Sequence, residues 1–166
     1  MLKTVKRKSH RANQARFAIV ASRYNARYVD SMLAAAKAEL KSASVGSIQV
    51  IRVPGAYEIP VVVSRLARTA SPHASRIAHH DRLRAIICLG VILRGETAHA
   101  AHIGEAVSRA LMQIQVRYEV PVIHEVLLLD NEEQARVRCL GKKHNRGAEA
   151  AQTALAMTEV MRELGP

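Results

Sequence analysis

The chain has 166 residues, of which 49% are hydrophobic, and a net charge of +11 at neutral pH. This length suits a single domain with a buried core, and two cysteines, Cys88 and Cys139, are too few for a disulfide-stapled scaffold. No apolar stretch reaches the ~20 residues of a membrane span, and the basic start lacks the apolar region of a secretory signal. We therefore expect a soluble, cytoplasmic protein with a mainly aliphatic core.

The positive charge is concentrated in two segments. Residues 1–16 contain six basic residues and residues 136–146 contain five, and neither segment contains an acidic residue. We interpret residues 1–15 as a basic tail before a domain spanning residues 16–166, and residues 136–146 as a segment able to serve an anionic ligand. Nucleic acid is not the favoured partner, because no nucleic-acid motif and almost no stacking aromatic residues accompany these charges.

Four short apolar runs alternate with segments of helical periodicity. In chain order, the pattern predicts a strand at 17–21, a helix at 29–40, a strand at 48–53, a helix over 59–67 with Pro60 in its first turn, a strand at 85–91, a helix over 103–114 that ends before Pro121, a strand at 122–129, and helices at 132–139 and 147–164.

This order of elements predicts an α/β domain with a four-stranded parallel sheet, right-handed crossovers and helices on both faces. Residues 69–82 fit no element and predict a surface loop. The loop contains three histidines, but their spacing matches no pattern of metal ligands.

The carboxyl edge of a parallel sheet is where such domains bind ligands. The segments that follow the predicted strands there are 22–25, 54–58, 93–99 and 129–130. They contain Tyr24 and Tyr57, two of only four tyrosines in a chain whose core is aliphatic. Tyrosines at this edge favour a ligand with a planar ring.

The third of these segments carries the most chemistry. Gly95 permits a sharp turn and Thr97 could cap the next helix, so that free backbone N–H groups and the helix dipole would form a phosphate site. His99, one turn into that helix, could transfer protons. The plainer interpretation is a capped helix with a solvated histidine, with Gly55 as a simple turn glycine and Glu58 as a first-turn acid.

Five strings at these same segments carry a resemblance to a known family. The chain resembles the lumazine synthases of riboflavin biosynthesis over residues 16–162, in the family's order, through IVASRYN (19–25), VPGAYEIP (53–60), GVILRGETAH (90–99), EQA (133–135) followed by Arg138, and NRGAEAA (145–151).

The resemblance implies a flavodoxin-like, three-layer α/β/α sandwich that is homo-oligomeric. It also implies a transferase reaction in which 3,4-dihydroxy-2-butanone 4-phosphate condenses with 5-amino-6-(ribitylamino)uracil. The products are 6,7-dimethyl-8-ribityllumazine, phosphate and water, and neither a cofactor nor a metal is required.

The same resemblance implies roles for individual residues. His99 would be the proton-transfer residue, and Arg138 of a neighbouring subunit would pair with the phosphate. The expected substrate-binding residues are Tyr24 for the pyrimidine, Ala56, Tyr57 and Glu58 for the ribityl chain, the main chain of Ile92 and Leu93 for the uracil edge, and Glu96 and Thr97 for the phosphate.

The chain departs from the family pattern at several positions. His124 stands where a phenylalanine is usual, Glu125 where a glycine is usual, and Arg146 where a lysine is usual. Two aromatic residues usual near the catalytic histidine are replaced by Ala100 and His102. We expect His124 still to stack on the substrate and to add a second titrating group beside it.

The family's assembly predicts at least a pentamer, with decamers and icosahedral shells as larger alternatives. His124, Arg138 and Arg146 would then complete a neighbour's site. Two functions remain open on the residues alone: the enzyme, and a non-catalytic flavin- or lumazine-binding or shell-forming scaffold of the same fold.

Overall fold

The computed structural model describes residues 14–73, 82–141 and 144–165. The basic tail, apart from residues 14 and 15, lies outside this range. The elements are β1 (Arg16–Ser22), α1 (Ala26–Ser42), β2 (Ser47–Val53), α2 (Ile59–Ala70), β3 (Leu83–Leu93), α3 (His99–Tyr118), β4 (Val122–Leu129), α4 (Glu132–Cys139) and α5 (Arg146–Leu164).

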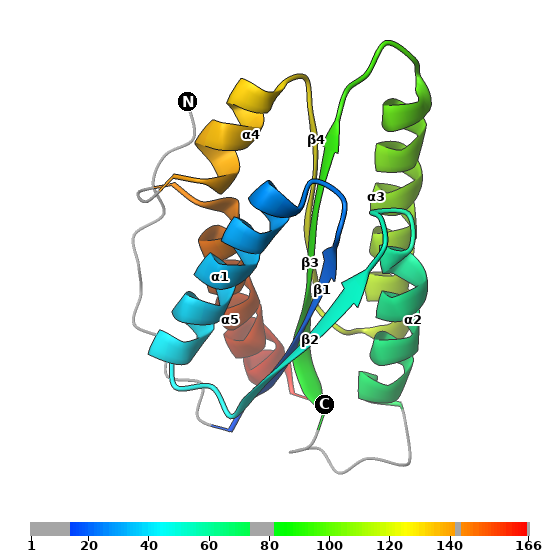
Figure 1. Cartoon of the computed structure of the whole chain (residues 1–166). Helices are drawn as coiled ribbons and strands as arrows, with labels where there is room; N and C mark the ends of the chain where they lie inside the picture. The colour runs from blue at the N-terminus through cyan, green and yellow to red at the C-terminus, as the bar shows by residue number, and fades with distance from the viewer. Residues whose placement is uncertain (1–13, 74–81, 142–143, 166) are drawn as a thin grey trace.

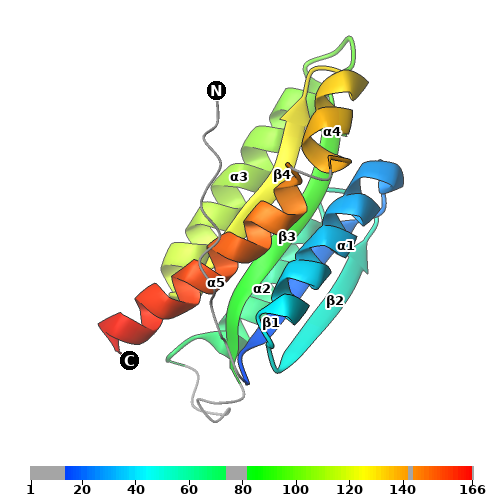
Figure 2. The same ribbon diagram turned by 90° about the vertical axis from the view of Figure 1, so that its left-hand side faces the viewer.

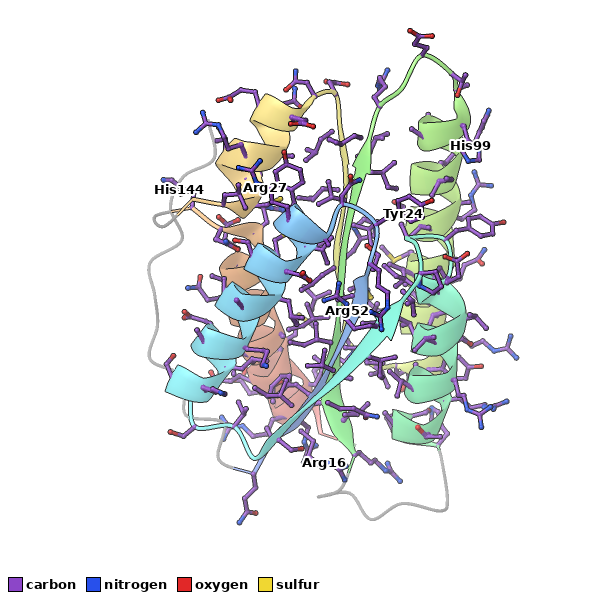
Figure 3. The ribbon with its side chains drawn as sticks, in the orientation of Figure 1. Arg16, Tyr24, Arg27, Arg52, His99 and His144 are labelled. Atoms are coloured by element: carbon purple, nitrogen blue, oxygen red, sulfur yellow. The ribbon has the colours of Figure 1, made fainter. Side chains whose placement is uncertain are left out.

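The four strands form one parallel sheet in the order β2-β1-β3-β4. Helices α1, α4 and α5 cover one face and α2 and α3 cover the other (Figures 1 and 2). The predicted α/β sandwich with a four-stranded parallel sheet is confirmed. Arg52 ties the edge strand β2 to its neighbours, since its Nη1 pairs with Asp30 of α1 and its Nη2 donates to the Ser22 carbonyl at 2.8 Å (Figure 3).

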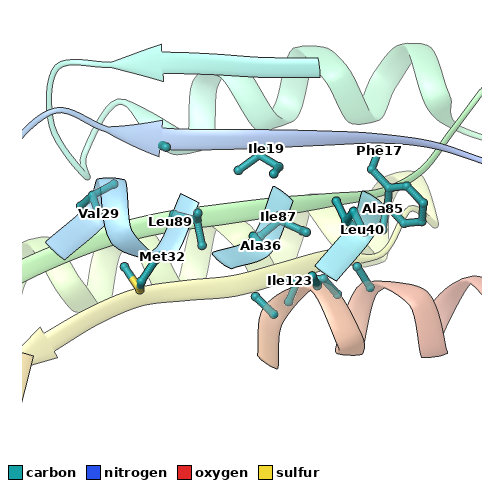
Figure 4. Close-up of a cluster of buried hydrophobic side chains, with 14 of the residues drawn as sticks. Phe17, Ile19, Val29, Met32, Ala36, Leu40, Ala85, Ile87, Leu89 and Ile123 are labelled. Carbon is teal, nitrogen blue, oxygen red and sulfur yellow. The ribbon is translucent and has the colours of Figure 1, made fainter. Parts of the chain in front are cut away.

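Two apolar clusters hold the layers together. On the α1 and α5 side, Phe17 and Ile19 of β1 pack with Ile87 and Leu89 of β3 (Figure 4). On the α2 and α3 side, the intervening residues, such as Val20 and Cys88, are equally buried. Both central strands therefore bury both faces, which is why their sequences are continuous apolar runs rather than alternating ones.

Helices α4 and α5 begin and end within one residue of the predicted bounds, whereas α1, α2 and α3 are longer than predicted and one predicted loop is correspondingly shorter. Helix α2 has Pro60 at its start, as predicted, and α3 ends at Tyr118, before Pro121. Helix α2 continues to Ala70, however, so residues 69 and 70 are helical rather than part of the predicted loop. Residues 74–81 of that loop lie outside the described residues. None of the helices in the described ranges is long and apolar enough to cross a bilayer.

The start of α5 is locked against α1. The Asn145 Oδ1 accepts from the Gly147 N–H at 2.9 Å, and the Asn145 Nδ2 donates to the Cys139 carbonyl at 2.6 Å. Ser31 of α1 donates to the same carbonyl at 2.7 Å. A Cβ on Gly147 would lie 2.0 Å from the Met32 carbonyl oxygen, so only glycine allows this approach of the two helices.

We expect Gly147→Ala to lower the free energy of unfolding by roughly 1–3 kcal/mol or more, because overpacked sites without room to relax cost that much. Urea denaturation followed by circular dichroism measures the change. Gly104→Ala is the matched control, since a Cβ there meets only the Leu128 side chain at 3.6 Å. Alanine inside helix α3 should then stabilise by roughly 0.5–1 kcal/mol. Equal midpoints for the two variants would contradict the packing argument.

Candidate active site at the carboxyl edge of the sheet

The loop that follows β1 is hydrogen-bonded to the end of β2, to the loop after it, and to the end of β3. Arg23 N donates to the Val53 carbonyl at 2.8 Å and Tyr24 N donates to the Pro54 carbonyl at 3.1 Å. Asn25 adopts a left-handed conformation (φ 54°, ψ 42°), which asparagine tolerates, and its Nδ2 donates to the Val91 carbonyl at 2.8 Å. The first loop therefore joins the second loop to the end of β3.

Tyr24 and Glu58 meet at Gly55. The Gly55 N–H donates to the Glu58 Oε2 at 2.8 Å. A Cβ on Gly55 would lie 2.9 Å from that oxygen and 3.8 Å from the Tyr24 ring. Glu58 is the N-cap residue of α2, yet its carboxylate turns back to Gly55 instead of capping the helix. Gly55 thus does more than turn the chain, because its lack of a side chain keeps the carboxylate and the ring close.

The loop after β2 exposes polar and aromatic side chains next to one buried residue. Ala56 is buried, while Glu58 is exposed. Tyr24 is 73% exposed and Tyr57 is 63% exposed, which is high for aromatic side chains of a folded domain. Two largely exposed tyrosine rings at this edge are suited to contact a planar ring.

The third loop leads directly into α3. Ile92 and Leu93 end β3, half-buried, and Glu96 and Thr97 are exposed. The prediction that Thr97 caps the helix is wrong. Ala98 is the N-cap residue, without a side-chain cap, and the Thr97 Oγ1 accepts only a long bond of 3.4 Å from His99 N.

His99 is the first residue of α3 rather than a residue one turn in. Its exposed imidazole lies near the carboxyl edge, as Tyr24 does (Figure 3). The first N–H groups of any α-helix lack intrahelical partners, so an anion can bind at the start of α3. The exposed imidazole of His99 therefore lies at a helix start that can accept an anion.

The fourth strand end joins the third through Arg94. Arg94 N donates to the Leu129 carbonyl at 2.8 Å, and its Nε pairs with Asp130 at 3.0 Å. Asp130 precedes α4, whose N-cap residue Asn131 accepts from Gln134 N at 2.9 Å. Helix α4 carries Arg138, which is exposed and has no ion-pair partner among the described residues.

Within one protomer the predicted site residues fall into two groups. The loops after β1, β2 and β3 bring Tyr24, Ala56, Tyr57, Glu58, Ile92, Leu93, Glu96, Thr97 and His99 to one edge. Arg138 and Arg146 lie on α4 and α5, in the layer on the opposite face of the sheet from α3 (Figures 1 and 2).

The basic segment 136–146 is less available to an anion than its composition indicates. Arg136 forms two bonds to Glu133, at 2.9 and 2.6 Å. Arg146 forms two bonds to Glu125, at 3.0 and 2.8 Å, and a third to Glu149 at 2.7 Å. The carboxylate partners of both arginines lie outside residues 136–146, so a count of acidic residues within that segment does not include them. Lys142 and Lys143 lie outside the described residues.

His124 and Glu125 are neighbours on β4 that point to opposite faces of the sheet. The His124 Nε2 lies 2.9 Å from the Ser108 Oγ on α3, and that hydroxyl donates to the Gly104 carbonyl. Burial lowers the pKa of His124, against the smaller effect of a bond to its own backbone. The pH dependence expected from this residue is therefore shifted toward lower pH.

Glu125, for which the sequence indicated no role, is buried. It is only 7% exposed, and burial raises its pKa although the charge of Arg146 acts in the opposite direction. A signal was present in the sequence: two departures from the family pattern, Glu125 and Arg146, carry opposite charges. They turn out to contact each other.

The described residues contain no group of three or more histidine, cysteine, aspartate or glutamate side chains placed to hold a metal ion. The groups available at this edge are backbone N–H groups, a carboxylate, two tyrosines and the His99 imidazole, a side chain able to donate or accept protons.

Comparison with known proteins connects this arrangement with one family. Residues 14–162 match the family described as 6,7-dimethyl-8-ribityllumazine synthase. The chain is 40% identical over 152 residues to the protein of that name from Stenotrophomonas maltophilia (strain R551-3), covering 90% of this chain and 91% of the relative. It is 39% identical over 153 residues to the one from Xanthomonas euvesicatoria pv. vesicatoria (strain 85-10), covering 91% and 92%. The chain belongs to the 6,7-dimethyl-8-ribityllumazine synthase family.

Proposed function

We propose that the chain is a transferase of riboflavin biosynthesis that condenses 5-amino-6-(ribitylamino)uracil with 3,4-dihydroxy-2-butanone 4-phosphate. The products are 6,7-dimethyl-8-ribityllumazine, phosphate and water. The observation that carries the proposal is the joined carboxyl edge, where the Tyr24–Gly55–Glu58 contact is tied through Asn25 to β3, the strand that leads to His99. Formation of lumazine absorbance from the two substrates tests it, and its absence would favour the non-catalytic scaffold.

The pyrimidine substrate fits the first three loops. Tyr24 would stack on the ring, and Tyr57 and Glu58 would hold the ribityl chain beside the buried Ala56. Pairing of β1 with β3 stops at Leu89, whereas β3 stays paired with β4 as far as Leu93. The end of β3 therefore has no strand beside it on the β1 side.

Alternation along β3 decides which backbone groups point into that gap. The Val91 carbonyl accepts from Asn25, on the β1 side, and Arg94 N donates to β4. Because backbone groups alternate along a strand, those of Leu93 face the gap and those of Ile92 face β4. We assign the uracil edge to the main chain of Leu93, with Ile92 contributing its side chain.

The phosphate fits the start of α3. Backbone N–H groups from Glu96 and Thr97 onward, together with the helix dipole, would bind the dianion. Arg138 is suited to add a bidentate bond because it has no carboxylate partner among the described residues. His99 would carry protons during imine formation and during loss of phosphate. Much of the remaining rate enhancement would come from holding two reactive substrates in register.

We infer that the complete site is shared between subunits, in a pentamer or an assembly of pentamers. In one protomer Arg138 and His99 belong to layers on opposite faces of the sheet (Figure 1). The outer faces of α2 and α3 expose apolar side chains, including Val61 and Val116, both 70% exposed, and Met112, 59% exposed. Such side chains are suited to burial against a second copy of the chain.

We expect His99→Ala to lower kcat by roughly 10²-fold or less, because positioning of the substrates survives and general acid–base catalysis contributes typically 10²–10⁴. Steady-state rates measured across pH check this. His73→Ala is the control, because His73 follows α2 at the amino end of the sheet and pairs with Glu119 at 3.5 Å. A His99→Ala enzyme with the wild-type rate and pH profile would remove the proton-transfer role.

Arg138→Ala should raise the KM for 3,4-dihydroxy-2-butanone 4-phosphate by roughly tenfold or more, the cost of a charge-assisted hydrogen bond, and change the KM for the pyrimidine far less. The two constants are obtained by varying one substrate at saturation of the other. Arg136→Ala on the same helix is the matched control, since Arg136 is already paired with Glu133. Equal effects of Arg138→Ala on both substrates would place it elsewhere.

A mixing experiment tests the shared site. When His99→Ala and Arg138→Ala subunits are refolded together in equal amounts, about one quarter of sites (½ × ½) receive intact residues from two different chains. The assay uses 3,4-dihydroxy-2-butanone 4-phosphate well below its wild-type KM, where the raised KM of Arg138→Ala also lowers the rate. Activity should then return to about a quarter of wild type, while each variant refolded alone stays below that level. No gain on mixing would mean that both residues of a site come from one chain.

A further inference from the structure

Arg146 is held between two carboxylates at the start of α5. Its Nε and Nη2 form a fork with the two Glu125 oxygens, and its Nη1 donates to Glu149. The Glu125 side chain is 9% exposed and that of Arg146 is 26% exposed. The fork is therefore a largely buried contact between β4 and α5, unlike the exposed Arg136–Glu133 fork on α4.

The charges of this cluster do not favour an anionic ligand. One guanidinium faces two carboxylates, so the cluster carries a net charge of about −1 when all three are ionised. The charge of Arg138 on α4 lowers the pKa of Glu125 slightly. The charge of Glu125 in turn contributes to the raised pKa of the buried Cys139 thiol. A phosphate dianion would meet repulsion from Glu125 and Glu149 beside Arg146.

The hydrogen-bond count shows what Arg146 can still do. A guanidinium has five N–H bonds, and three of them are used by Glu125 and Glu149. Two remain, one on Nη1 and one on Nη2, in directions set by the fork. A buried ion pair is a poor source of stability, because desolvation offsets the attraction, but it fixes geometry well.

We infer that Glu125 is a positioning residue, which turns Arg146 into an oriented donor for an uncharged carbonyl or hydroxyl oxygen of the pyrimidine substrate bound at a neighbouring protomer. The inference rests on the proposed function and assigns a different ligand group to each of the two arginines. Arg138, without a carboxylate partner in the described chain, takes the phosphate. Arg146, already neutralised, takes a neutral acceptor, of which the ribitylaminouracil offers several.

Kinetics of Glu125→Gln provides the test. The amide keeps the size of the side chain but offers a single acceptor oxygen, so the fork is lost and Arg146 turns more freely. We expect the KM for the pyrimidine to rise roughly tenfold, while the KM for the butanone phosphate stays unchanged or falls because the cluster loses one negative charge. Arg146→Gln should give the same rise for the pyrimidine, and the double variant should be no worse than Arg146→Gln alone.

Glu133→Gln is the matched control, since it breaks the same kind of fork at an exposed place and should leave both constants unchanged. Circular dichroism and the size of the assembly show whether each variant folds. If Glu125→Gln does not fold, Glu125→Asp is measured instead. It keeps the charge but cannot span the same fork, so the same split between the two substrates is expected, with a smaller rise.

Three results would overturn the inference. The first is that Glu125→Gln, or Glu125→Asp in its place, has the wild-type KM for both substrates. The second is that this variant raises both KM values equally. The third is that Arg146→Gln raises the KM for the butanone phosphate as strongly as Arg138→Ala does. The proposed function fails separately, and only if the wild-type protein forms no lumazine.

Discussion

Parallel pairing of the strands is the constraint on which the whole molecule depends. A strand that runs parallel to its neighbour must be reached through a helix, so every strand ends at the same edge and every turn there leads into a helix. Cross-links then make that edge one unit: Arg23 to β2, Asn25 to β3, and Arg94 to β4. Loops that are far apart in the sequence thereby place aromatic rings, a carboxylate and an imidazole within one region.

Electrostatics in this protein is decided by partners rather than by composition. Arg136, Arg138 and Arg146 lie within eleven residues of one another, yet the first and third are bound by carboxylates and the second is exposed. The Glu125–Arg146 contact also has a cost. Because burial raises the folded-state pKa of Glu125, the stability associated with its neutral form is present at low pH and is lost as pH rises from its ordinary value of 4.5 through the folded-state value. We therefore explain the contact by the orientation that Glu125 gives to the Arg146 guanidinium, rather than by a gain in folding stability.

Periodicity and turn chemistry were enough to predict the layers, the parallel sheet and the four segments at its carboxyl edge, because local apolar patterns report burial directly. They failed where an outcome depended on tertiary packing. Thr97 is of a residue type that often caps helices, but α3 begins at His99, so its N-cap position is Ala98, which has no side chain able to cap. The Glu125–Arg146 fork joins positions 21 residues apart, and it exists only because α5 packs beside β4. The end of β3 is open only because β1 is shorter, which no pattern within β3 could reveal.

The two thiols of the chain offer a built-in view of how the fold opens. Burial raises the pKa of Cys88, in the middle of the sheet, far above its ordinary value, and raises that of Cys139, at the end of α4, to about 11. Neither sulfur is an accessible thiolate in the closed state, so alkylating reagents must wait for a fluctuation that exposes it. Cys139 would report detachment of α4, the helix that carries Arg138, and Cys88 would report rupture of the sheet itself. Their rates of modification would separate movement of α4 from unfolding of the domain.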